Sequence, residues 1–176
     1  MLIYFKGVEF MGKVSIARVD ERLIHGQVMT SMSKRSGANA IFISDDDVAK
    51  DDFMKTIFQS AGGRTGLAVK ILSIDDTISY WNEKQFDNFS AILLTKNIKS
   101  IYQLVKKGLP VEQLNLGGIA KRPTTTYVIN SVAIDKDAAL MLKELYDDYK
   151  VNVYFQTVPS SQKVELSAAL KLFQLS

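Results

Sequence analysis

The sequence predicts an α/β fold: an open, mostly parallel sheet of about six to seven strands with helices on both faces. Short runs rich in Val, Ile, Leu and Phe alternate with segments of helical character along all 176 residues. Most of these runs are apolar without a break, which is typical of strands buried on both faces. Parallel strands need long crossover connections, and the helical segments between the runs supply them.

The expected strands are spread evenly along the chain. They cover residues 14–19, 40–45, 67–73, 90–95, 112–116, 125–134 and 151–157. No repeat or linker rich in Pro, Gly or Ser interrupts the sequence, so we expect a single domain over residues 11–176. Residues 1–10 precede a Met-Gly pair that could itself open this domain, and we treat them as an N-terminal extension of unknown role.

Glycines and capping residues mark the expected helix ends. Gly37 follows a helix over 26–36 and Gly108 follows a helix over 98–107, and basic residues in both last turns suit the helix dipole. The expected N-caps of the last two helices are Asp135 and Ser160 or Ser161.

Composition excludes several classes of function. With no cysteine, the chain has neither a disulfide nor a thiolate zinc site, and with one histidine a metal site is not expected. Lys and Arg number 22 against 19 for Asp and Glu, and no long basic block suggests nucleic acid. No apolar run approaches the roughly 18 residues that span a bilayer. We therefore expect a soluble protein without a cofactor, and the lack of cysteine allows a cytoplasmic location.

The only histidine, His25, lies in the stretch DERLIHGQV, directly after the first expected strand. In an open parallel sheet, ligands bind beyond the carboxyl ends of the strands, which places His25 at a functional position. Gly26 lets the backbone approach a ligand, and the helix that starts there directs its free N–H groups toward the loop. A neutral imidazole, whose reference pKa is about 6.5, is a nucleophile near pH 7.

Charged residues around His25 indicate phosphoryl chemistry. Arg18 and Arg22 carry guanidinium groups, whose geometry matches phosphoryl oxygens. Asp20 and Glu21 could orient these arginines or a ring nitrogen. The pattern favours capture of a phosphoryl group by His25 without a metal ion. ATP is not an expected donor, because the chain has neither GxxxxGK[ST] nor GxGxxG.

Structural roles compete with these assignments. A lone histidine is more often a hydrogen-bonded structural residue than a chemical one. The run Asp45, Asp46 and Asp47 follows a strand, as metal-binding acids do in receiver-type domains, but it is also an ordinary helix start, which we favour. A non-enzymatic binding or regulatory module is therefore the second class of function.

Other loop residues are secondary candidates. Gly117 and Gly118 follow an apolar run and could approach a phosphate, although a simple turn explains them equally well. Two basic or polar pairs at loop positions could touch phosphate or a partner, but a solvated surface is favoured for both: Lys96 with Asn97, and Lys121 with Arg122.

The run ARVDERLIHGQV resembles the R-[IV]-D-[DE]-R-L-I-H-G-Q-V segment that carries the phosphorylated histidine in the IIB components of the mannose/fructose/sorbose family of bacterial sugar phosphotransferase systems. Similarity continues through ISDDDVAKD, AILLTKN, LPVEQLNLGGIA and VNVYFQTVPSSQKVEL, so only residues 1–10 fall outside it. The resemblance implies that His25 accepts the phosphoryl group, with Arg18, Asp20 and Arg22 around it and Gly26 and Gln27 beside the phosphate.

The resemblance also implies which partners the protein has and where in the cell it lies. A phosphohistidine IIA protein or domain would donate to His25, and the group would pass to a sugar held by membrane IIC and IID partners. The protein would be cytoplasmic and associated peripherally with that permease, and it could form a homo-oligomer. The chain departs from the family pattern at Met32, where tryptophan is usual, at Thr95, where phenylalanine is usual, and at Ile98, where proline is usual. These departures leave the sugar and the choice of partner open.

Overall fold

The computed structural model describes residues 11–175, so the expected extension over residues 1–10 lies outside the described part. Seven strands form one sheet in the order β3-β2-β4-β1-β5-β8-β9, as predicted, and a separate hairpin joins β6 to β7. All neighbours in the large sheet are parallel except β8 and β9. The strands are β1 (Lys13–Asp20), β2 (Ala40–Ser44), β3 (Ala68–Leu72), β4 (Ser90–Thr95), β5 (Gln113–Gly118), β6 (Thr126–Ile129), β7 (Val132–Ile134), β8 (Asn152–Phe155) and β9 (Val164–Glu165).

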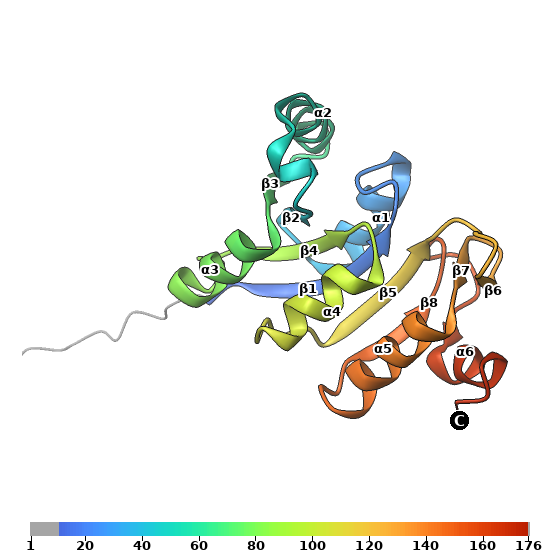
Figure 1. Ribbon diagram of the computed structural model, residues 1–176. Coiled ribbons are helices and arrows are strands. Elements are labelled where there is room, and N and C mark those ends of the chain that lie inside the picture. The colour runs from blue at the N-terminus through green and yellow to red at the C-terminus, as the bar shows by residue number, and fades with distance from the viewer. Residues whose placement is uncertain (1–10, 176) are drawn as a thin grey trace, which may run out of the picture.

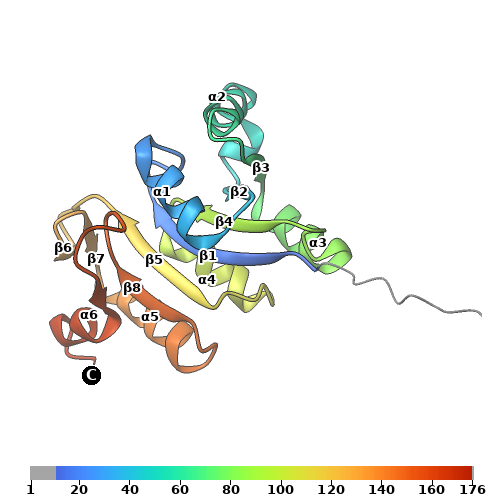
Figure 2. The ribbon, with the colours of Figure 1, turned by 180° about the vertical axis from the view of Figure 1, so that it is seen from behind.

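Helices cover both faces of the sheet, but not equally (Figures 1 and 2). Side chains of α1 and α2 pack on one face, around Ile41, Ile43 and Leu94, and those of α3 to α6 build a larger core on the other. None of these helices, within residues 11–175, is long and apolar enough to cross a membrane. The helices are α1 (Gly26–Ser36), η1 (Val48–Lys50), α2 (Asp52–Gly63), α3 (Ile74–Lys84), α4 (Ile98–Lys106), α5 (Lys136–Asp147) and α6 (Leu166–Leu172).

The winding direction of the sheet explains both the unequal cover and the position of the site. From β1 the chain winds through β2 to the edge strand β3, with α1 and α2 on one face; from β3 it returns through β4 and β5 to β8, with α3, α4 and α5 on the other. The connections that leave β1 and β5 therefore run in opposite directions. Two adjacent strands whose outgoing connections run in opposite directions leave a crevice at their carboxyl ends. Ligands of open α/β sheets bind in this crevice.

Two predicted elements are wrong. Residues 125–134 form a hairpin instead of one strand, because Asn130 and Ser131 make a turn between Ile129 and Val132, which are paired across it. The last helix begins at Leu166 rather than after Ser160 or Ser161, since residues 164–165 first pair with β8 as an antiparallel edge strand.

The predicted helix ends are otherwise confirmed. Gly37 follows α1 in the left-handed conformation, with φ of 65°. The Asp135 side chain caps α5 by accepting from the backbone N–H of Ala138 at 2.8 Å. Of the three consecutive acids, Asp45 has the capping role we favoured, because it accepts from Val48 N at the start of η1 at 2.9 Å. Asp46 instead accepts from Ile74 N, at the start of α3, at 2.8 Å.

Candidate functional site

The loop between β1 and α1 is held in a strained backbone conformation. Leu23 has φ of 55° although it is not glycine, and its side chain is buried. A turn in which Leu23 N donates to Asp20 O at 2.9 Å and a bond from Glu21 N to Gly118 O at 2.9 Å fix the loop to the ends of β1 and β5. Such conformations are costly and concentrate at functional sites.

Asp20, at the end of β1, is the centre of the site. Its carboxylate is fully buried and accepts from Arg18 Nη2 at 2.8 Å, from Arg22 Nε at 3.0 Å and from Arg22 Nη2 at 3.1 Å. The backbone N–H of Arg22 donates to the same carboxylate at 3.1 Å. Burial by itself would raise the pKa of Asp20, but the hydrogen bonds from Arg22 and the charge of Arg18 outweigh it and hold the pKa below its usual value.

Arg18 lies within the sheet, not at its surface. Its guanidinium donates to Asn115 Oδ1, Gln156 O and Thr157 O as well as to Asp20, and only 1% of the residue is exposed. Burial lowers the pKa of Arg18, while the charge of Asp20 opposes that shift. Arg18, a predicted site residue, therefore contacts Asp20 and is linked to His25 only through that carboxylate.

Gly117 and Gly118 end β5 and lie under the same side chains. A Cβ on Gly117 would overlap the Arg18 guanidinium, and one on Gly118 would come within 2.7 Å of Asp20 Oδ1. The structure thus gives the glycine pair a packing reason that the sequence did not reveal: only glycine leaves room for the buried Arg18–Asp20 pair.

His25 is the residue immediately before α1, and its ring is half-buried beside Asp20. The Nδ1 atom lies 2.9 Å from Leu23 O; because a carbonyl only accepts, Nδ1 carries the proton. The Nε2 atom lies 3.8 Å from Asp20 Oδ2, is enclosed, and finds no hydrogen-bond partner among the described residues. The ring is thus oriented by a backbone carbonyl at Nδ1, while Nε2 faces the Asp20 carboxylate without a hydrogen bond.

The start of α1 adds a positive electrostatic potential to this loop. No side chain within the described ranges caps the helix, and its first turn contains no acidic residue. Its first N–H groups and the positive end of its dipole are therefore available to an anion. Gly26 opens the helix with φ of 47°, a conformation that favours glycine. The side chain of Gln27, also predicted to contact phosphate, lies outside what the structure describes.

The other candidates surround the site without touching His25. Glu21 pairs with Arg122 at 2.6 Å and also accepts from Ala120 N at 3.1 Å, so it joins the loop to the segment after β5. Asn97 caps α4 by accepting from Ser100 N at 2.8 Å. Lys96 lies 3.7 Å from Asp45, and Lys121 donates to backbone carbonyls of its own loop.

Asn115 is a residue of the site that sequence reasoning missed. It lies in the middle of β5, is 2% exposed, accepts from Arg18 and donates to Gln156 O at 3.1 Å. A single asparagine inside an apolar strand was the available signal, since a buried amide requires partners.

The fold and the site define an α/β protein with an open sheet and a histidine-bearing loop at the crevice between its central strands. A family model described as PTS system sorbose subfamily IIB component matches residues 14–175. The chain therefore belongs to the mannose/fructose/sorbose family of IIB components of sugar phosphotransferase systems. It is thus a phosphotransferase-type protein of bacterial sugar transport.

Individual relatives agree with this assignment. The sorbose-specific EIIB component of Lacticaseibacillus casei is 37% identical over 133 residues, which are 76% of this chain and 80% of that protein. The mannose-specific EIIAB component of Escherichia coli K12 is 30% identical over 75% of this chain and 41% of its own length. The crystal structure of manxB from Thermoanaerobacter tengcongensis superposes with a TM-score of 0.86 at 38% identity, covering 92% of this chain and 97% of that one.

Proposed function

We propose that His25 accepts a phosphoryl group from a phosphohistidine IIA protein or domain and passes it to a sugar held by membrane IIC and IID partners. The observation that carries the proposal is the position of His25: it lies between the uncapped start of α1 and an Asp20 carboxylate clamped by two arginines. The name of the E. coli relative, EIIAB, joins an A and a B component and supports a IIA partner.

Each residue has a distinct part in this proposal. Arg22 is the exposed cation of the loop, with 54% of its side chain accessible, and its guanidinium can turn from Asp20 to phosphoryl oxygens. Asp20 and the buried Arg18 are positioning residues that hold Arg22 and the imidazole. The N–H groups of α1 stabilise the charge on the transferred group, because they are fixed before it arrives.

Transfer requires the His25 ring to leave its resting orientation. Nδ1 faces Leu23 O and Nε2 is enclosed beside a carboxylate, which repels phosphoryl oxygens. We infer that the ring breaks its bond to Leu23 and turns toward the start of α1. The lone pair of a ring nitrogen then forms a bond to phosphorus as the donor N–P bond breaks and returns its electron pair to the donor imidazole, in line with the attack.

Labelling tests the proposal. Incubation with a IIA protein carrying labelled phosphohistidine should transfer label that is stable to alkali and labile to acid. His25→Ala and the size-conserving His25→Gln should both remain unlabelled, while far-UV circular dichroism and thermal unfolding show that they are folded. Label that persists in these variants would reject phosphoryl transfer through His25 and favour a structural role for the ring.

A further inference from the structure

A second polar site lies on the half of the sheet that the winding leaves uncovered. Because only α1 and α2 pack on that face, no helix in the described part of the chain covers it over β5 and β8 (Figure 2). A cavity of about 370 Å³ opens there between α1, β1, β5, β8 and the segment after β8. This volume lies within the usual range for small-molecule sites.

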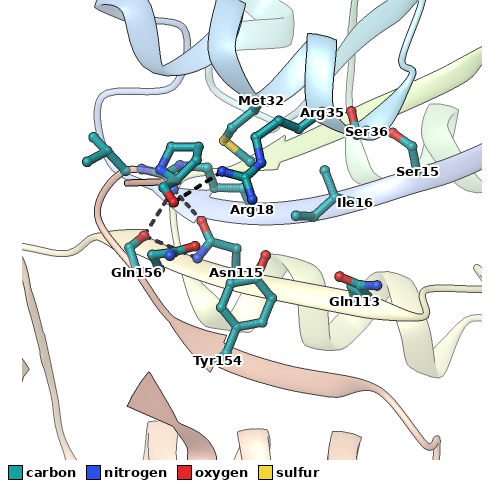
Figure 3. A pocket seen from close by; sticks show the side chains of 12 residues that line it. Ser15, Ile16, Arg18, Met32, Arg35, Ser36, Gln113, Asn115, Tyr154 and Gln156 are labelled. Carbon is teal, nitrogen blue, oxygen red and sulfur yellow. Dashed lines mark hydrogen bonds between the residues drawn. The ribbon is translucent and has the colours of Figure 1, made fainter. Parts of the chain in front are cut away.

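Two guanidinium groups and no carboxylate line this cavity. Arg18 forms part of its base, and its Nε is buried without a hydrogen-bond partner among residues 11–175. Arg35 reaches from α1 toward the sheet (Figure 3), with a contact of Nη1 to Pro159 O at 3.3 Å. A buried donor without an acceptor costs free energy. The charge of Arg18 is balanced by Asp20 at 2.8 Å, whereas no carboxylate of the cavity wall balances that of Arg35. An anion in the cavity would supply Arg35 with a counter-charge.

The rest of the wall is suited to hydroxyl groups and a ring. The Tyr154 hydroxyl points into the cavity in Figure 3, and the structure records no hydrogen bond from it. Gln113 supplies an amide, which both donates and accepts, as sugar hydroxyls do. The hydroxyls of Ser15 and Ser36 donate to Ala91 O and Ser33 O and can accept from a ligand. Burial raises the pKa of Tyr154 while the charges of Arg18 and Arg35 oppose the shift, so the phenol stays a donor at neutral pH.

We propose that this cavity binds a small sugar phosphate, with its phosphate group against Arg35 and the Tyr154 hydroxyl and its hydroxyl groups toward Gln113 and the serines. The site is distinct from the His25 loop and does not require phosphoryl transfer. Arg18 connects the two places, since the same guanidinium lines the cavity and holds Asp20 at 2.8 Å.

Calorimetric titration with three probes tests the proposal: glucose 6-phosphate, glucose and inorganic phosphate. Glucose 6-phosphate should bind saturably and more tightly than either of the others. Arg35→Gln should weaken it roughly tenfold or more, because it removes a charge-assisted contact. Lys34→Gln is the matched control: it removes the same charge one residue earlier on α1, outside the cavity, and should leave the affinity within about twofold. Tyr154→Phe should weaken binding several-fold with little change of shape.

Four outcomes would overturn the proposal. These are the absence of saturable binding, equal losses in Arg35→Gln and Lys34→Gln, inorganic phosphate binding as tightly as the sugar phosphate, and loss of binding in His25→Ala. The last would place the ligand at the His25 loop. Retained binding in His25→Ala supports the cavity site even if the labelling experiment fails, so the two proposals are tested separately.

Discussion

The buried carboxylate of Asp20 allows a sharp prediction. Asp20→Asn leaves Arg18 buried without its counter-ion, and removal of one partner of a buried pair costs about 3–5 kcal/mol. Arg18 keeps three other acceptors, on Asn115, Gln156 and Thr157, so the lower end applies. The exposed pairing with Arg22 adds at most about 1 kcal/mol. We therefore expect the free energy of unfolding to fall by about 3 kcal/mol, or roughly 6 to 12 °C in Tm for a chain of this size.

Urea unfolding of wild type, Asp20→Asn and Glu21→Gln measures this loss in the free energy of unfolding. Glu21→Gln is the control, because it neutralises the neighbouring acid, whose ion pair with Arg122 is solvent-exposed, and should cost at most about 1 kcal/mol. A loss below about 1 kcal/mol in Asp20→Asn would refute the assignment of Asp20 as the counter-ion of Arg18.

The same comparison has a pH dependence of known sign. The pKa of Asp20 is lower in the folded than in the unfolded chain, so its contribution is complete above the unfolded value, about 3.9, and is lost as the pH falls through the folded value. The stability difference between wild type and Asp20→Asn should therefore be constant above about pH 5 and shrink below about pH 4. A difference that grows on acidification would contradict the lowered pKa.

Three further substitutions, two of them with a matched control, test the loop and the residues beneath it. Gly117→Ala should cost about 1–3 kcal/mol in urea unfolding because its Cβ overlaps Arg18, whereas Gly63→Ala, with open space around it in α2, should cost nothing; equal effects would contradict the packing role. Gly26→Ala and Gly66→Ala should each cost about 1 kcal/mol because both positions have positive φ, but only Gly26→Ala should slow labelling by a IIA protein. Arg22→Lys should slow labelling with Tm unchanged within about 2 °C, and an unchanged rate would remove Arg22 from its role.

The sequence was informative where one local pattern decides the structure. Continuous apolar runs predicted the central strands, and Gly37 and Asp135 marked helix ends, because these signals act over a few residues. The break at Asn130 was missed because a two-residue turn of Asn and Ser is a weak signal inside an apolar run. The short strand at 164–165 was missed because its formation depends on the free edge of β8, which is far away in sequence.

The candidate site shows the same contrast between features that a local sequence pattern predicts and features that depend on distant residues. The motif located His25, Arg22 and Asp20, whose positions follow from the end of β1. It could not show that Arg18 is buried, because that depends on Asn115 of β5 and on the carbonyls after β8. The function of Gly117 and Gly118 was equally hidden, since it depends on side chains of another strand that fill the space above them.

Arg18 both lines the cavity and holds the Asp20 carboxylate, and this has a practical consequence for inhibition. A compound that fills the open half of the sheet could draw this guanidinium away from its carboxylate and loosen the histidine loop from beneath. Under the proposed transfer through His25, such a compound would slow phosphoryl transfer without occupying the loop itself.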